Sequence, residues 1–111
     1  MAHYMIESSY GAQDMAALVQ SPTDRSTVAK ALVEQLGGRI EVYYYAFGDY
    51  DLISIVELPD NISSGALALA LAGSGAFKAV KTTVLLTVED GMSAMRKAQG
   101  LRALYQPPSA A

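Results

Sequence analysis

The side chains best suited to chemistry gather around one short stretch of the sequence, Phe47-Gly48-Asp49-Tyr50-Asp51. It sets two carboxylates beside a phenol, and the predicted fold brings further phenols and lysines to the same end of the molecule. Such groups could bind a small polar molecule, or could position a proton transfer if burial shifts their pKa values. The sequence therefore predicts a ligand-binding site made of Tyr10, Tyr45, Asp49, Tyr50, Asp51, Ser74, Lys78 and Lys81.

The same residues also have an ordinary structural interpretation. Asp49 could shape a turn, Tyr50 could pack beside a hairpin, and Asp51 could pair with a nearby amide or lysine. Short carboxylate side chains often bond to the backbone of the turn that holds them. The residue types alone leave both interpretations open.

Other groupings typical of enzymes are missing from the sequence. With no cysteine there is no thiol nucleophile, disulfide or thiolate metal site, and His3 is the single histidine. We therefore predict no metal and no cofactor. The run Gly73-Ser74-Gly75 ends a predicted helix, so its amides do not converge on a phosphate as they would at the start of a helix.

Composition narrows the class of protein. A net charge of −3 argues against general nucleic-acid binding, and 51% hydrophobic residues exclude disorder. No apolar run approaches the ~20 residues of a membrane span. The first residues lack the basic start of a signal peptide. These features predict a soluble cytoplasmic protein with one domain over residues 1–105 and a flexible tail over 106–111.

Four strands are predicted from alternating and β-branched residues. They cover residues 3–10, 39–46, 52–58 and 79–88. The turn between the second and third contains Gly48, which supplies the backbone freedom that a tight reversal needs. These two strands therefore form a hairpin at the middle of the fold.

Helices are predicted between and after the strands. Residues 11–19 form a short helical or looped piece, and Ser21-Pro22-Thr23-Asp24 is typical of the start of a helix that Gly37-Gly38 ends. Residues 65–73 alternate Leu and Ala with the period of a strand, but their propensity favours a helix, capped by Ser63 or Ser64. A last helix runs from Met92 to about Tyr105, with Asp90 as its N-cap.

The order of elements is β-α-β-β-α-β followed by a terminal helix. Right-handed crossovers then give a four-stranded antiparallel sheet with strand order 4-1-3-2 and two helices on one face. We expect an α+β fold of the ferredoxin-like kind. The second face of the sheet is left without a helix.

That open face predicts self-association. Residues 52–58 are apolar on both sides, which is typical of a strand buried on both sides, although the pattern leaves open which side faces the helices. Strict alternation places Tyr43 and Tyr45 on the open face. Large exposed apolar patches are rare on monomers, so we predict a homodimer or higher homo-oligomer, unless the last helix folds back over the sheet. The predicted interface, with Lys81 as a further polar partner, is Glu7, Arg39, Glu41, Tyr43, Ile53, Ile55 and Leu85.

The hairpin resembles the signature of the GYD-domain family. The similarity covers roughly residues 3–100, and the chain departs from the family pattern in its three consecutive tyrosines and its longer C-terminal extension. The resemblance implies a ferredoxin-like fold of the dimeric α/β-barrel type, and it supplies no catalytic residue. The matching segments are Phe47-Gly48-Asp49-Tyr50-Asp51-Leu52 with the strand to Asp60, Leu36-Gly37-Gly38, Ala68-Leu69-Ala70 and Lys81-Thr82-Thr83-Val84.

Two classes of function follow. The first is a non-catalytic module, a small oligomer that binds a metabolite or a partner between sheet and helices. The second is a cofactor-free enzyme, similar in architecture to dimeric α/β-barrel monooxygenases or isomerases that act on small aromatic or polyketide-like substrates. The enzyme needs a closed cavity of ~300 Å³ or more with an acid, base or phenol pointing in, whereas the module is expected to have either no such cavity or one lined without titratable groups. The sequence favours the module, because groupings of His with Asp or Glu are missing.

Overall fold

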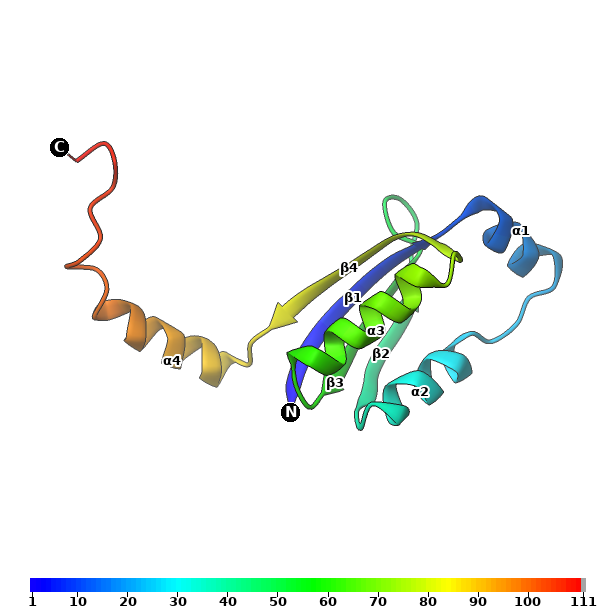
Figure 1. The fold of residues 1–111 in the computed structure, drawn as a ribbon, viewed down its shortest axis with the longest axis horizontal. Helices are drawn as coiled ribbons and strands as arrows, with labels where there is room; N and C mark the ends of the chain where they lie inside the picture. The colour runs from blue at the N-terminus through cyan, green and yellow to red at the C-terminus, as the bar shows by residue number, and fades with distance from the viewer. Residues whose placement is uncertain (111) are drawn as a thin grey trace.

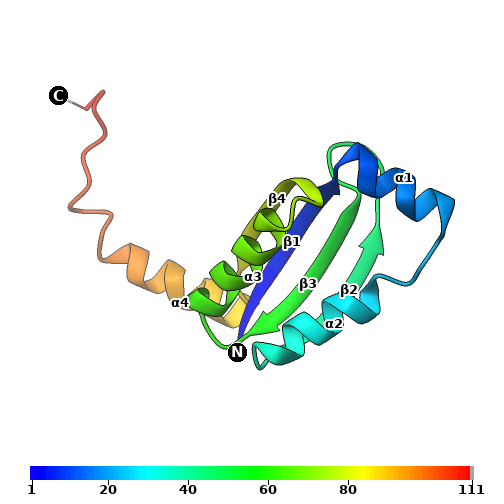
Figure 2. The ribbon, with the colours of Figure 1, turned by 45° about the vertical axis from the view of Figure 1, so that its right-hand side comes forward.

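A four-stranded antiparallel sheet forms the centre of the fold (Figures 1 and 2). The structure, a computed structural model, describes residues 1–110, so the last residue of the predicted tail, Ala111, lies outside the described residues. None of the helices that the structure describes could span a membrane. The elements are β1 (Ala2–Tyr10), α1 (Ala12–Gln20), α2 (Ser26–Gln35), β2 (Arg39–Tyr45), β3 (Leu52–Leu58), α3 (Asn61–Gly73), β4 (Phe77–Leu85) and α4 (Val88–Gln99).

The strand order in the sheet is β2-β3-β1-β4, and every neighbouring pair is antiparallel. Read from the other edge, this is the predicted order 4-1-3-2, so the predicted sheet and the α+β class are confirmed. The bounds of β3 are those expected from the sequence. The hairpin turn also forms as predicted, with Gly48 at a φ of 112°.

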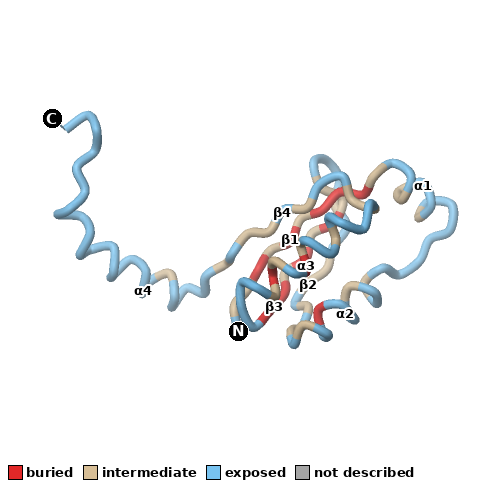
Figure 3. Tube along the Cα trace, viewed as in Figure 1, coloured by how far each residue is buried: buried red, intermediate tan, exposed pale blue. Residues whose placement is uncertain are grey.

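Helices α2 and α3 cover one face of the sheet, with α2 packed over β2 and α3 over β4 and β3 (Figure 2). The alternation of burial along β3 shows which of its two sides faces the helices. Leu52, Ser54, Val56 and Leu58 are buried, and the alternate residues between them are half-buried. The buried positions lie mainly along β1 and β3, in the middle of the sheet (Figure 3).

The core lies between β1, β3 and the two covering helices. Tyr4 is 1% exposed, and its hydroxyl donates a hydrogen bond of 2.7 Å to Asn61 Oδ1 at the start of α3. A buried phenol needs such a partner, so this bond ties β1 to α3. The buried cluster consists of Tyr4, Ile6, Val33, Val56, Leu58 and Leu67.

The predicted start of the second helix is wrong. Ser21 closes α1, where its N–H donates to the Ala17 carbonyl at 2.9 Å, and α2 begins only at Ser26. The Asp24 carboxylate accepts a bond of 2.9 Å from the Ser26 N–H. A residue that precedes proline avoids the helical region, so the chain stays extended at Ser21-Pro22 before α2 can begin. Residues 11–19, expected as a helical or looped piece, are largely α1.

The other helix ends also differ from the prediction. The Leu/Ala run is helical as expected, but the cap of α3 is Asp60, whose Oδ1 accepts from the Ser63 N–H at 2.8 Å. Its hydrogen bonds with Ser63 hold the pKa of Asp60 below the usual value. Helix α4 begins at Val88, with Thr87 as its cap, instead of at Met92 with Asp90 as its cap. Strand β4 accordingly ends at Leu85, before the predicted Val88.

A β-bulge in β2 changes the side of the sheet on which the tyrosines lie. Ile40 pairs with Val56 and Val42 with Ile55, so Glu41 is an extra residue on β2. After the bulge, Tyr43 is opposite Ser54 and Tyr45 opposite Leu52, both on the helix-covered side. The prediction that Tyr43 and Tyr45 lie on the open face is wrong, because strict alternation cannot anticipate an extra residue.

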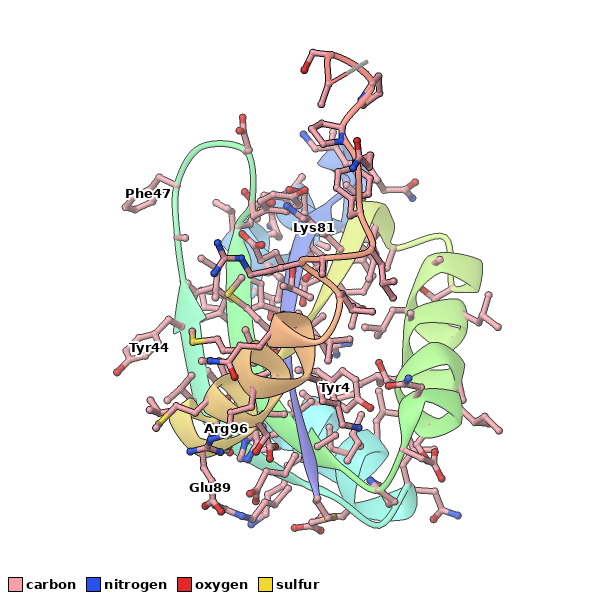
Figure 4. The ribbon with its side chains drawn as sticks, turned by 90° about the vertical axis from the view of Figure 1, so that its left-hand side faces the viewer. Tyr4, Tyr44, Phe47, Lys81, Glu89 and Arg96 are labelled. Atoms are coloured by element: carbon pink, nitrogen blue, oxygen red, sulfur yellow. The ribbon has the colours of Figure 1, made fainter. Side chains whose placement is uncertain are left out.

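The same bulge moves Tyr44 to the open face of the sheet. Tyr44 is opposite Ile53 and points away from α3, as does Phe47 in the hairpin turn (Figure 4). Val42, opposite Ile55, joins it on the open face. The bulge therefore adds Val42 and Tyr44 to the open face in place of the two predicted tyrosines.

The C-terminal part of the chain leaves the body of the protein. Helix α4 and the residues after it extend away from the sheet on the side opposite α1, which lengthens the molecule to 60 Å (Figures 1 and 2). None of the residues of α4, all of which the structure describes, is buried. The alternative that this helix folds back over its own sheet is therefore wrong for the single chain.

Candidate functional site

A cavity of about 320 Å³ lies between the sheet and helices α2 and α3. Its walls come from all four strands and from helices α2 and α3, and they are mainly apolar, with aromatic rings from the strands and small or branched side chains from the helices. The lining residues are Tyr10, Arg25, Val28, Ala29, Leu32, Tyr43, Leu52, Ala70, Leu71, Ser74, Ala76 and Phe77.

Two bulges place the aromatic rings in this cavity. The bulge at Glu41 turns Tyr43 inward, and a second register shift lies between Ser9 and Tyr10, where Tyr10 pairs with Phe77 and Ser9 with Ala79. The second bulge brings Phe77 to the helix-covered side. Its ring stacks on that of Tyr10 with centroids 4.6 Å apart.

Tyr43 is the titratable side chain of the cavity whose environment is most altered. Its ring meets Tyr45 edge to face at 6.1 Å between centroids. Burial raises the pKa of the Tyr43 phenol well above its usual value, the nearby phenols of Tyr10 and Tyr45 raise it further, and Arg25 lowers it only in part. At neutral pH the phenol therefore keeps its proton and can donate a hydrogen bond.

The structure brings together only part of the predicted ligand site. Tyr10 and Ser74 line the cavity, and Tyr45 lies next to it, against Tyr43. Tyr50 and Lys78 are outside its lining, and Lys81 lies opposite Glu7 on the open face of the sheet. Grouping Lys81 with the tyrosines is wrong, since the β1–β4 register puts it on the other side.

The two aspartates of the hairpin have structural roles, Asp51 through its carboxylate and Asp49 through its main-chain carbonyl. Asp51 Oδ2 accepts a bond of 3.1 Å from the Tyr10 N–H, and the Asp51 N–H donates to the Ser8 carbonyl at 2.9 Å. The Asp49 carbonyl accepts from Ser9 Oγ at 2.6 Å. These bonds fasten the hairpin turn to the end of β1, beside the bulge that positions Tyr10. The two aspartates thus support the cavity wall without lining it.

This fastening gives a testable prediction. Asp51→Ala removes the acceptor of the Tyr10 N–H at a part-buried place, and an unsatisfied amide costs about 1–3 kcal/mol. We expect the free energy of unfolding in urea to fall by about that amount. Asp49→Ala is the matched control, because Asp49 contributes its main-chain carbonyl to the bond with Ser9. A loss as large for Asp49→Ala would show that the Asp51 carboxylate has no special role.

Of the lining residues outside the predicted site, Phe77, Arg25 and Tyr43 are the ones with an aromatic or charged side chain. Phe77 depends on a bulge that alternation does not reveal. Arg25 precedes α2, inside a segment that was expected to be helical already. Tyr43 was assigned to the open face for the reason given above. The spacing of Val28 and Leu32 on α2 was a usable signal, since it marked the helix face that lines the cavity.

The open face carries the other predicted residues. His3 pairs with Leu85, Met5 with Ile55, and Glu7 with Ile53 and Lys81, so these side chains share the side away from α2 and α3. Arg39 and Glu41 reach the same side through their contacts with Glu57 and His3. The predicted interface residues that share this side are Glu7, Arg39, Glu41, Ile53, Ile55 and Leu85, without Tyr43.

A polar cluster lies at one end of this face. His3 Nδ1 is 2.6 Å from Glu41 Oε1, and His3 Nε2 is 3.7 Å from Glu57 Oε1. One ligand-type atom from each residue lies within 4.8 Å of the others, a donor set that a divalent cation could use. Arg39 contacts the second oxygen of Glu57, so a cation is already paired with that carboxylate. We interpret the cluster as a hydrogen-bonded polar network at the edge of the apolar face.

Comparison with known proteins gives one family and one structure. A family model described as GYD domain matches residues 4–95. No curated protein matches the chain. Among solved structures, the chain is similar to one titled "crystal structure of FFRP-DM1", with a TM-score of 0.45 and 16% identity over 78% of this chain and 100% of that chain.

Proposed function

Because the chain belongs to the GYD-domain family, we propose that it is a ferredoxin-like, homo-oligomeric module that binds a small molecule in the cavity between the sheet and helices α2 and α3. The observation that carries this proposal is the cavity itself. Its volume of about 320 Å³ lies in the range typical of ligand pockets. Its aromatic walls are held in place by two bulges and by the Asp51 bond to Tyr10.

The lining indicates the class of ligand. Stacked Tyr10 and Phe77, with the aliphatic side chains of α2 and α3, favour a flat or branched apolar body. Arg25 is the charged residue of the lining, and the Tyr43 phenol is a hydrogen-bond donor. A cation beside a donor favours an anionic group on the ligand. We therefore expect a small aromatic or aliphatic molecule that carries a carboxylate or a similar anion.

The chemistry of the lining favours binding over catalysis. Among the described residues, the lining of the cavity includes no Asp, Glu or His. A phenol whose pKa is raised by burial is a poor general base at neutral pH. Binding therefore needs nothing that the cavity lacks, whereas proton abstraction would need a group that is deprotonated at neutral pH.

A cofactor-free enzyme is the second candidate, and one observation favours it. The cavity reaches the volume expected for an active site, and the phenols of Tyr10 and Tyr43 belong to its lining. A protonated phenol could stabilise an enolate or a similar oxyanion of a bound aromatic substrate. This candidate requires turnover that disappears in Tyr43→Phe, whereas the binding module requires none.

Titration with a fluorescent anionic aromatic probe, 8-anilinonaphthalene-1-sulfonate, tests the proposed binding site. We expect Arg25→Gln to weaken binding of the probe about tenfold or more, because a hydrogen bond to a charged group contributes about 1.5–3 kcal/mol. Ala70→Phe, which fills the cavity from α3, should abolish the same binding. Lys30→Gln is the matched control, since Lys30 is an exposed cation on α2 that pairs with Glu34.

The two variants also separate the cavity from other apolar surfaces. Probe bound to the open face or to the C-terminal residues would not respond to either substitution. A ligand site in this cavity would therefore be contradicted if the probe bound with equal affinity to the unchanged protein, to Arg25→Gln and to Ala70→Phe.

Self-association is the second part of the proposal. The open face sets the side chains of Met5, Val42, Ile53 and Ile55 side by side on neighbouring strands. Contiguous apolar patches of this kind are uncommon on monomers. The resemblance to the GYD-domain family implies paired subunits as well. We propose that a second copy of the chain covers the open face of each subunit.

A further inference from the structure

The C-terminal arm, which we define as residues 86–105, exposes an unusual number of large apolar side chains. Val88 is 83% exposed and Leu104 is 77% exposed, and the arm makes no buried contact in α4 (Figure 3). A group of this size left in water is a mark of an interaction site. The exposed apolar residues of the arm are Leu86, Val88, Met92, Met95, Leu101, Leu104 and Tyr105.

Within the arm, α4 has one apolar side. Val88, Met92 and Met95 follow the spacing i, i+4, i+7, so they form a stripe along one side of the helix. The charged residues Glu89 and Lys97 lie off that stripe. A helix of 12 residues is marginal in water on its own, so α4 needs a surface that covers its stripe.

The open face of the sheet is the matching surface. A shallow recess of about 210 Å³ lies on it beside Ile55, Leu85 and Leu86, at the place where the arm begins. A helix of 12 residues is about 18 Å long, close to the roughly 23 Å of a strand of seven residues such as β3. The stripe can therefore run along the strands of such a face.

Charge also favours this pairing. After Asp90 the arm contains three basic side chains, those of Arg96, Lys97 and Arg102, and it contains no acidic ones. The open face carries three glutamates, Glu7, Glu41 and Glu57, against two basic side chains, Arg39 and Lys81, so its charge is negative by one. The basic end of α4 would meet these carboxylates if the stripe lay on the apolar centre of the face.

The connection between β4 and α4 directs the arm toward another chain. Only Leu86 and Thr87 lie between the two elements, and Thr87 is extended, with φ −63° and ψ 161°. The chain therefore continues outward from β4 instead of reversing over its own sheet (Figures 1 and 2). An arm that projects from the body with its apolar stripe uncovered has the form of an exchanged segment.

We propose that the C-terminal arm is exchanged between two copies, so that α4 of each copy lays Val88, Met92 and Met95 on the open sheet face of the other. This inference rests on the homo-oligomer of the proposed function and names the segment that builds it. Each open face then gains a helix on its uncovered side. Each α4 gains the surface that its stripe lacks.

Cysteine cross-linking tests the exchange, because the natural chain contains no cysteine. Met92→Cys and Ile55→Cys are made as two separate proteins, mixed, unfolded in urea, refolded together and oxidised. The expected main product is a covalent heterodimer, seen as a shift from one chain of 11.8 kDa to the mass of two chains. Phe47→Cys replaces Ile55→Cys in the matched control, since Phe47 is fully exposed at the hairpin turn and should give little product with Met92→Cys.

Three other results would overturn the exchange. A chain that carries both Met92→Cys and Ile55→Cys and closes its disulfide internally would show that the arm folds back. Strong cross-linking of Ile55→Cys to itself would show two sheets packed directly, which keeps the homo-oligomer but removes the arm from the interface. An absence of cross-linking in a protein that is still an oligomer would place the arm elsewhere, whereas a monomer would contradict the proposed assembly itself.

Discussion

Replacing Ile55 with lysine should split the oligomer into monomers while the subunit stays folded. Ile55 lies at the centre of the open face, where it pairs with Met5 on β1 and Val42 on β2. It is half-buried in the single chain, so a lysine there can reach water. In the oligomer the same ammonium group would be enclosed by apolar side chains, and an unpaired buried charge costs several kcal/mol.

The expected effect is a weakening of association by about a hundredfold or more, since each 1.4 kcal/mol is a factor of ten. Light scattering on a size-exclusion column, run over a dilution series, measures it. The far-ultraviolet circular dichroism spectrum should remain that of the unchanged protein. Phe47→Lys is the control, because Phe47 is exposed in the hairpin turn and should leave association as it was. An Ile55→Lys protein that stays associated at all concentrations would contradict an interface on this face.

Replacing Gly38 with alanine should cause the largest loss of stability of the variants proposed. A Cβ atom on Gly38 would overlap the Glu57 carbonyl oxygen and lie 2.8 Å from Leu58 Cδ2. Both obstacles belong to β3, and Leu58 is fully buried in the core. The chain could relieve the overlap only by moving β2 away from β3. We expect the free energy of unfolding to fall by about 3 kcal/mol or more, at the upper end of the cost of overpacking.

A urea titration of Gly38→Ala beside Gly65→Ala checks this result. Gly65 lies inside α3 and an added Cβ would meet nothing within 4 Å, so alanine there should stabilise the protein by about 0.5–1 kcal/mol. The two substitutions are chemically the same and should shift the midpoint in opposite directions. A Gly38→Ala protein as stable as the natural one would mean that β2 and β3 do not approach as closely as described.

The general architecture could be predicted because each strand and helix carries its own signal. The bounds of β3 follow from an apolar run between the hairpin turn and Pro59, and α3 follows from the helix propensity of Leu and Ala. The antiparallel order then results from the handedness of the crossovers. These signals are local, and the structure agrees with them.

The ends of the helices were harder to predict, since several residues nearby can serve as caps. Asp60 and Ser63 are both suitable for the start of α3, and the structure uses the side chain of Asp60 to hold the Ser63 amide. At α4 the capping side chain is that of Thr87, whose Oγ1 accepts from the Asp90 N–H, and not that of Asp90. Which candidate wins depends on where the preceding strand leaves the sheet, and that position is a property of the assembled fold.

The candidate site depended on features without a local signal. The extra residue at Glu41 turns Tyr43 into the cavity without interrupting the run of strand-forming residues around it. The extra residue at Lys78 turns Phe77 into the cavity ahead of the predicted start of the fourth strand at residue 79, because β4 begins at Phe77. Tyr10 is one of the candidate ligand residues singled out from the sequence, and it belongs to the lining of the cavity. The sequence also offered a structural role for Asp51, which the bond to the Tyr10 amide confirms.

The proposed assembly and the exchange of the C-terminal arm both require that a second copy of the chain covers the open face of the sheet. Sedimentation velocity of the unmodified protein at micromolar concentration measures this directly. We predict a species that contains at least two chains of 11.8 kDa and that does not dissociate within this range. A single boundary with the mass and the elongated shape of one free chain would contradict the proposed assembly, because the open face and the C-terminal arm would then both be stable in water.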